Sequence, residues 1–199
     1  PGDISSAAYW LVIGAIHPDA KIKMSGVSIN PTRTGIIDVL LKMGAKLGIE
    51  NQRWAGSEPV ADLYIQSSEL SGVQIEGELI PRLIDEIPVI AVAACAAKGT
   101  TIIKDAAELR VKETDRISRT VSELTKLGAK VEELPDGIAI RGGAKLHGAE
   151  CSSHGDHRLA MALGVAGLIA KGKTAIHNAE VVEFSYPAFW QDMERIREG

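Results

Sequence analysis

The chain has 199 residues, of which 45% are hydrophobic and 24% charged, and its formal net charge is −4. This length suffices for one globular domain with a sizeable core, and the proportions are those of an ordinary soluble protein. The acidic balance argues against nucleic acid as the main partner, because binding to a phosphate backbone usually needs a basic surface. The longest apolar stretch, 87–97, is too short to span a bilayer, so we expect no membrane partner.

The cysteine and histidine residues exclude two further classes of protein. Cys95 and Cys151 form neither a disulfide framework nor a metal-binding spacing, and the histidines show no ligand pattern. We therefore expect no metal site. This cysteine usage suits a reducing cytoplasm, which is where we expect the protein to act.

Three segments of the chain share one pattern, in which a turn with an aspartate leads into an apolar, alanine-rich helix. The aspartates are Asp3, Asp85 and Asp156, and the helices are 7–16, 89–97 and 159–170. We interpret each aspartate as a helix N-cap, because its carboxylate can accept hydrogen bonds from free backbone N–H groups.

Each apolar helix is followed by a turn, a short strand and a second, amphipathic helix. The turns are Pro18-Asp19, Lys98-Gly99 and Lys171-Gly172, the strands are 21–24, 100–104 and 173–177, and the second helices are 35–43, 114–127 and 188–197. In the first two copies we expect paired strands next, 61–66 with 73–76 and 130–134 with 137–141. The third copy has no such pair.

The repeat predicts an α/β fold of βαβαββ units, with buried parallel helices and outer sheets. The units span about 1–80, 81–150 and 151–199, and the third is incomplete. Either the third unit has lost its strand pair, or sequence outside this chain supplies it. We favour the second explanation, and since the chain begins with Pro1 rather than Met we expect it to be part of a longer protein.

The run Arg110-Val111-Lys112-Glu113-Thr114-Asp115-Arg116 lies where the second helix of the second unit should begin. Lys112 and Arg116 would share a helix face if the helix has begun there. Two cations at a helix N-terminus favour binding of phosphate or carboxylate, and Glu113 beside them could exchange protons with a substrate. The alternative is a solvated, charged turn.

The third unit opens with Asp156-His157-Arg158. Arg158 can contact a carboxylate or phosphate through two N–H groups, and His157 can donate a hydrogen bond or move protons. If the three helix N-termini converge, Asp85 faces the same cleft as these residues. Otherwise each of them is a cap or a surface charge.

The charged run, together with Asp156-His157-Arg158-Leu159-Ala160-Met161, closely resembles motifs of the 5-enolpyruvylshikimate-3-phosphate synthase family, as do the segments 2–6 and 30–35. The resemblance covers the whole chain but only the second half of the family's usual sequence. It implies that 1–199 is the C-terminal one of two similar domains, with the N-terminal domain missing. It also implies transfer of the enolpyruvyl group of phosphoenolpyruvate to the 5-hydroxyl of shikimate 3-phosphate, a step of aromatic amino acid biosynthesis that needs no metal or organic cofactor.

The same resemblance implies a role for each charged residue. Asp85 lies near the 5-hydroxyl as a base that also holds the shikimate, and Glu113 exchanges the proton at the enolpyruvyl methylene carbon. Lys112 lies between the two substrates. Arg116 and Arg158 bind phosphoenolpyruvate, with His157 beside them.

The chain departs from the family pattern at two places. Glu183-Phe184-Ser185 stands where many members have a lysine that contacts phosphoenolpyruvate, and Glu108 stands where some have an asparagine that binds the shikimate phosphate. Two alternatives remain, namely transfer to a UDP-sugar and a non-catalytic binding module built on the same repeat. On the leading interpretation the isolated chain is expected to be inactive.

Overall fold

The computed structural model of the protein describes the backbone of residues 1–198 and the side chains of residues 1–196. The first unit contains α1 (Ile4–Ile16), β1 (Lys21–Ser28), α2 (Gly35–Lys42), β2 (Lys46–Ala55) and β3 (Glu58–Gln66). The second contains β4 (Gln74–Ile75), α3 (Ile87–Ala96), β5 (Thr100–Ile103), α4 (Arg116–Lys126), β6 (Lys130–Leu134) and β7 (Gly137–Arg141). The third contains β8 (Glu150–Ser152), α5 (His157–Ile169), β9 (Ala175–His177) and α6 (Phe189–Glu198).

In each unit the apolar helix connects two neighbouring stretches of extended chain that run parallel. β4 pairs with β5, and β8 pairs with β9, while in the first unit a single bridge joins Gly2 to Val27 of β1. The predicted turns after the apolar helices are confirmed, since Asp19, Gly99 and Gly172 all have positive φ angles. Glycine is favoured at such angles because it has no Cβ to clash with the backbone.

An antiparallel hairpin extends the sheet in the first two units. The sheet orders are β1-β3-β2 and β4-β5-β7-β6. The predicted pair 130–134 with 137–141 is confirmed as β6 and β7. The predicted pair 61–66 with 73–76 is wrong, because β3 pairs with β2, and β4 belongs to the second sheet.

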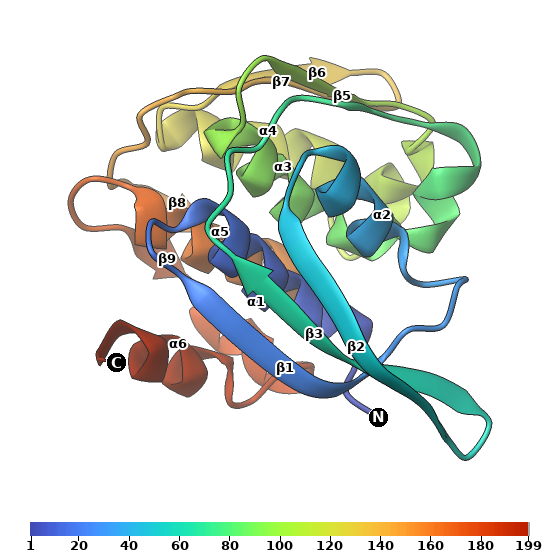
Figure 1. The fold of residues 1–199 in the computed structure, drawn as a ribbon. Coiled ribbons are helices and arrows are strands. Elements are labelled where there is room, and N and C mark those ends of the chain that lie inside the picture. Colours follow the sequence, from blue (N-terminus) through green and yellow to red (C-terminus); the bar gives the residue numbers. More distant parts are fainter. Residues whose placement is uncertain (199) are drawn as a thin grey trace.

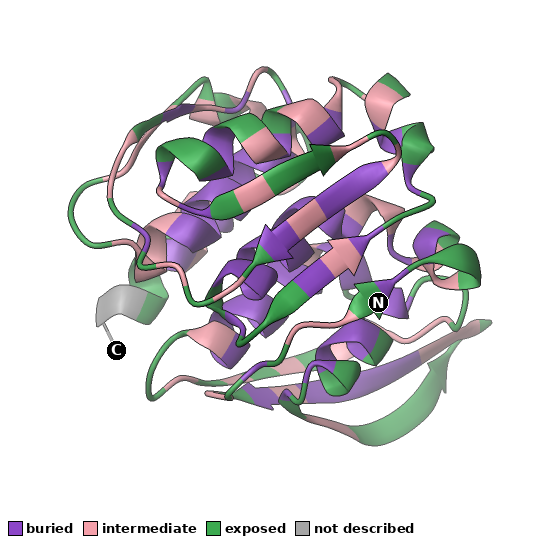
Figure 2. Ribbon diagram, turned by 90° about the horizontal axis from the view of Figure 1, so that it is seen from above, coloured by how far each residue is buried: buried purple, intermediate pink, exposed green. Residues whose placement is uncertain are grey.

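The three apolar helices α1, α3 and α5 pack against one another in the interior, and the sheets lie outside them (Figure 1). Nearly every side chain of α3 is buried, and the same holds for most of α1 and α5 (Figure 2). This arrangement explains their composition, since a helix surrounded by protein on all sides has no polar face. Gly14 of α1 lies so close to Ile65 of β3 that a Cβ there would be 2.4 Å from its side chain.

Most of the aromatic residues gather where α6 meets α1. Phe189 is buried and makes ring contacts with Tyr9, Trp10, Tyr186 and Trp190. The Trp10 indole donates to the Tyr186 hydroxyl over 3.1 Å, and this hydroxyl donates to Asp192 over 3.0 Å. The C-terminal helix is thereby fixed to the interior helices.

Candidate active site

The N-termini of the apolar helices lie close together at one end of the molecule, so that Asp85, just before α3, is 3.3 Å from Arg158 of α5. The sequence alone leaves this convergence open. The Asp3 carboxylate caps α1 by accepting from the Ser6 N–H, and Asp156 caps α5 by accepting from the N–H groups of Arg158 and Leu159. Asp85 does not cap α3, so its predicted role as a cap is wrong. It lies one residue earlier, in a 3-10 turn (Ile84–Glu86), and Glu86 occupies the N-cap position without making a capping bond.

Because Asp85 precedes the N-cap position by one residue, its carboxylate is free to contact residues of the second and third units. Its Oδ1 accepts from Arg116 over 3.0 Å, and its Oδ2 lies 3.3 Å from the Arg158 guanidinium. Burial opposes its ionisation, but Arg158, Arg116 and Lys112 together hold the pKa of Asp85 below its usual value. Asp85 is therefore an ionised carboxylate between two arginines.

Arg116 is the centre of the charged cluster. Its side chain is only 1% exposed, and it donates to Asp156 over 2.6 Å, to Asp85, and to Glu113. Burial alone would lower the pKa of this guanidinium, but Asp156, Glu113 and Asp85 raise it, so the positive charge is secured. A single side chain thus joins residues from the second and third units.

Arg158 lies beside this centre, at the first turn of α5. Besides Asp85, its guanidinium is 3.8 Å from the buried Glu86 carboxylate. Burial raises the pKa of the Tyr9 hydroxyl of α1, against the smaller, lowering effect of the positively charged Arg158. His157 precedes it and is half-buried; burial and the charge of Arg158 lower the pKa of its imidazole. A neutral imidazole can donate through one nitrogen and accept through the other.

The charged run 110–116 divides into structural and site residues. Arg110 donates to the carbonyl groups of Pro135 and Leu134 on the β6–β7 hairpin, and Asp115 caps α4 by accepting from the Ser118 N–H. Since α4 begins only at Arg116, the condition for a shared helix face of Lys112 and Arg116 is not met. Lys112 instead lies on the loop before the helix, where it pairs with Glu108 over 2.5 Å.

The loop that leads to Asp156 and the start of α5 is fixed by a second buried carboxylate, Glu123 of α4. Glu123 is 0% exposed and accepts from the Ser152 N–H over 3.0 Å, from Lys126, and from the His154 ring at 2.7 Å. His154 has a φ angle of 52°, so this loop is tightly bent just before α5. Glu123 therefore holds the start of α5 against α4.

The structure brings together the predicted residues Asp85, Glu113, Arg116, His157 and Arg158, with Lys112 at the edge of the group. Sequence reasoning missed Glu86 and Tyr9, and it read Asp156 only as a cap. Alignment of the three units on their first helical residues, rather than on their aspartates, would have placed Glu86 opposite Asp3 and Asp156. The described residues contain no group of His, Cys, Asp or Glu side chains arranged to hold a metal ion, and none of the helices described is long and apolar enough to cross a membrane.

Comparison with known proteins assigns the family. The sequence model of the EPSP synthase (3-phosphoshikimate 1-carboxyvinyltransferase) family matches residues 1–193. The chain belongs to the EPSP synthase family.

Curated relatives within the EPSP synthase family are similar along the whole chain. Proteins named 3-phosphoshikimate 1-carboxyvinyltransferase from Roseiflexus castenholzii and Herpetosiphon aurantiacus are each 58% identical over 100% of this chain. In both cases the match covers 46% of the relative. The chain thus spans about half the length of the curated relatives it matches.

Solved structures agree with the EPSP synthase assignment, and they too are about twice as long as this chain. EPSP synthase from Acinetobacter baumannii has a TM-score of 0.95 and 43% identity, over 98% of this chain and 46% of that one. The enolpyruvyl transferase NikO from Streptomyces tendae, at 19% identity and a TM-score of 0.77, shares the fold.

The two departures from the EPSP synthase family pattern, at Glu108 and near Phe184, can both be located in the structure. Glu108 is the partner of Lys112, so its carboxylate is engaged by a cation of the same loop. Phe184, near the expected lysine, ends a 3-10 turn (Ala179–Phe184) with 90% of its side chain exposed. Neither side chain disturbs the cluster around Arg116.

Proposed function

We propose that the full protein transfers the enolpyruvyl group of phosphoenolpyruvate to the 5-hydroxyl of shikimate 3-phosphate, and that this chain supplies one half of the active site. The observation that carries the proposal is a chain of ion pairs where the helix N-termini come together. Arg116 pairs with Asp85 and Glu113, and Asp85 also pairs with Arg158. These residues come from motifs that match the family, and helix N-termini favour anionic groups.

The reaction requires a base for the acceptor hydroxyl and a proton donor for the methylene carbon. The hydroxyl oxygen bonds to C2 of phosphoenolpyruvate while C3 gains a proton, and then the C2–O(phosphate) bond breaks and C3 loses a proton. Asp85, kept ionised by its arginines, suits the first role. Glu113 suits the exchange at C3, because its carboxylate is 45% exposed beside Arg116.

The charges of the cluster support the idea that the chain is only half of the site. Three cations, Lys112, Arg116 and Arg158, are paired with four carboxylates, Asp85, Glu108, Glu113 and Asp156. Two anionic substrates would therefore meet an excess of negative charge. We infer that further cations come from the part of the protein outside this chain.

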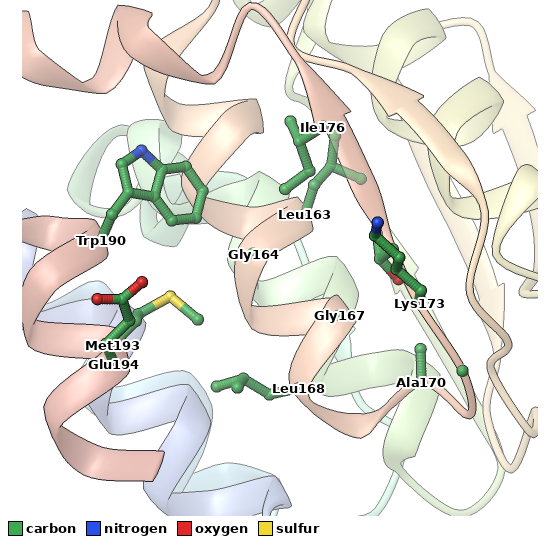
Figure 3. A pocket seen from close by; sticks show the side chains of 12 residues that line it. Leu163, Gly164, Gly167, Leu168, Ala170, Lys173, Ile176, Trp190, Met193 and Glu194 are labelled. Carbon is green, nitrogen blue, oxygen red and sulfur yellow. The ribbon is translucent and has the colours of Figure 1, made fainter. Parts of the chain in front are cut away.

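The third sheet supports the same division of the protein. On one side β9 pairs with β8, but within residues 1–198 no strand occupies its other side, where β3 and β7 lie in the first two units. Beside this edge a cavity of about 610 Å³ opens between α5 and α6, and the side chains of Leu163, Trp190 and Met193 face it (Figure 3). We propose that the N-terminal part of the full protein supplies the missing strand pair, so that 1–199 completes a C-terminal domain of three units.

The proposed reaction takes place in the cytoplasm. Cys95 and Cys151 are both buried, free thiols, and burial raises the pKa of Cys151 to about 11. Unpaired thiols of this kind suit a reducing compartment.

The function is tested by steady phosphate release in the full-length protein that contains this chain, with phosphoenolpyruvate and either shikimate 3-phosphate or UDP-N-acetylglucosamine as acceptor. We expect turnover only with shikimate 3-phosphate. Lys112→Ala should lower kcat/KM by about 100-fold, as removal of one fixed charge-stabilising group typically does.

Lys98→Ala is the matched control, because Lys98 also pairs with one glutamate, Glu69, but on the far side of the second unit from the charged cluster. It should leave turnover unchanged. Turnover with the UDP-sugar alone would replace the proposed acceptor, and unchanged kinetics in Lys112→Ala would contradict the assigned site.

A further inference from the structure

One oxygen of the charged cluster is buried without a hydrogen bond. Glu86 is 3% exposed, and among the described residues its Oε1 has no hydrogen-bonding partner. The Arg158 Nη1 atom stays 3.8 Å away, too far for a hydrogen bond. A buried, ionised carboxylate without full pairing is strongly disfavoured, and the usual remedy is a proton.

Groups from four parts of the fold face Glu86. They are Ser5 and Tyr9 of α1, Asp85 of the same turn, Arg158 of α5, and Arg33 of the loop before α2. Burial raises the pKa of the Glu86 carboxyl and Asp85 adds to this, while the Ser5 hydroxyl, Arg158 and Arg33 lower it; the net shift is upward. Tyr9 adds no charge, because burial raises the pKa of its phenol as well.

Arg158 already has one ionised partner, Asp85, whose pKa is held low. With Glu86 also ionised, the single positive charge of the guanidinium would face two negative charges, which would weaken its attraction for a substrate anion. A protonated Glu86 can still accept a hydrogen bond through its carbonyl oxygen and donate one through its hydroxyl. It would then pack beside the Arg158 guanidinium, 3.8 Å away, and limit its movement without competing for its charge.

We propose that Glu86 is a positioning residue for Arg158 that carries a proton when an anionic substrate is bound, so that substrate binding takes up a proton at this side chain. The inference rests on the function proposed above and extends it to the protonation state of the site. The negative charge of the substrate makes ionisation of Glu86 still less favourable, and linkage then requires that a proton on Glu86 favour binding.

The sign of the pH dependence follows directly. Below the pKa of Glu86 the residue is protonated and binding is strongest. As the pH rises through that pKa, KM for phosphoenolpyruvate should increase, by up to about tenfold per pH unit for one proton taken up. Glu86→Gln keeps a donor and an acceptor in the same shape but cannot ionise, so its KM should lack this increase.

The experiment compares KM and kcat for phosphoenolpyruvate across pH in the full-length wild-type protein and in Glu86→Gln. Ionisation of the substrates is identical in the two proteins and cancels in their ratio. At low pH the KM of the variant should be within about threefold of the wild-type KM, a difference smaller than the loss of one hydrogen bond would cause. The ratio of KM values, wild type over variant, should then rise with pH.

Asp62→Asn is the control for loss of a buried carboxylate. Asp62 is 7% exposed on the first sheet, where the Asn51 amide, the Gly26 N–H and Arg53 lower its pKa to about 2. It is ionised and fully paired, so its amide variant should leave the pH profile of KM unchanged. An equal loss of kcat/KM in Glu86→Gln at every pH would show that Glu86 acts as an ionised counterion, and would overturn the inference.

A second readout does not depend on turnover. At a pH above the pKa of Glu86 in the substrate-free protein, addition of phosphoenolpyruvate should produce a protonated carboxylic acid band in the infrared difference spectrum of the wild-type protein, and this band should be missing in Glu86→Gln. Absence of the band from the wild type would refute the proton on Glu86 even if turnover is normal. Absence of wild-type turnover with both substrates would instead refute the proposed function.

Discussion

Arg116 shows at the scale of a single residue how structure and proposed chemistry depend on each other. Its side chain is fully buried and joins Asp85, Glu113 and Asp156, which come from three different turns. The sequence predicts that charged residues lie here, and that they face Asp85 and Arg158 if the helix N-termini converge. It does not predict the burial of Arg116, because nothing in a run of seven residues, six of them polar, indicates which one turns inward.

Removal of Arg116 should therefore destabilise the fold as well as the site. Arg116→Ala leaves the Asp156 carboxylate, which is 0% exposed, without its cation, and loss of one partner of a buried pair costs about 3–5 kcal/mol. Arg195→Ala is the control; this arginine is 76% exposed, and its pairing with Asp192 should contribute at most about 1 kcal/mol. Urea unfolding followed by tryptophan fluorescence measures both, and equal effects would contradict the central role of Arg116.

At the scale of the elements, the repeat was readable wherever apolar residues follow a clear period. The helices α1, α3 and α5 and the hairpin β6–β7 all have such patterns and were predicted correctly. The strand β2 was missed because its outward side chains are polar and most of the strand is exposed, so it lacks an alternating pattern. The Gly56-Ser57 turn between β2 and β3 was the available signal, since such a pair is typical of a tight hairpin.

The open edge of the third sheet leads us to a prediction about the strand β9. Ala175 donates to the carbonyl of Ala149, as Ile102 donates to that of Val73, so Ile176 corresponds to Ile103, the residue that lies opposite Ile138 in β7. The amide of Ile176 should therefore exchange its hydrogen rapidly in the isolated chain and slowly in the full-length protein. Ile103 is the control and should be protected in both. Equal exchange of Ile176 in the two proteins would contradict the missing strand pair.

At the scale of the whole molecule, a well-packed interior carries a site that we propose to be only half of the full one. The helices and two of the sheets enclose a core of small aliphatic residues. The charged cluster at the helix N-termini contains more carboxylates than cations, and the matched relatives are about twice as long as this chain. The central claim is therefore that residues 1–199 form half of an enolpyruvyl transfer site.

Phosphate release with phosphoenolpyruvate and shikimate 3-phosphate tests that claim most directly, measured for the purified 199-residue chain and for the full-length protein at equal concentration. Correct folding of the isolated chain is checked first by the fluorescence of its buried Trp10. We expect steady release by the full-length protein and none by the folded chain. Steady release by the chain alone would contradict the account.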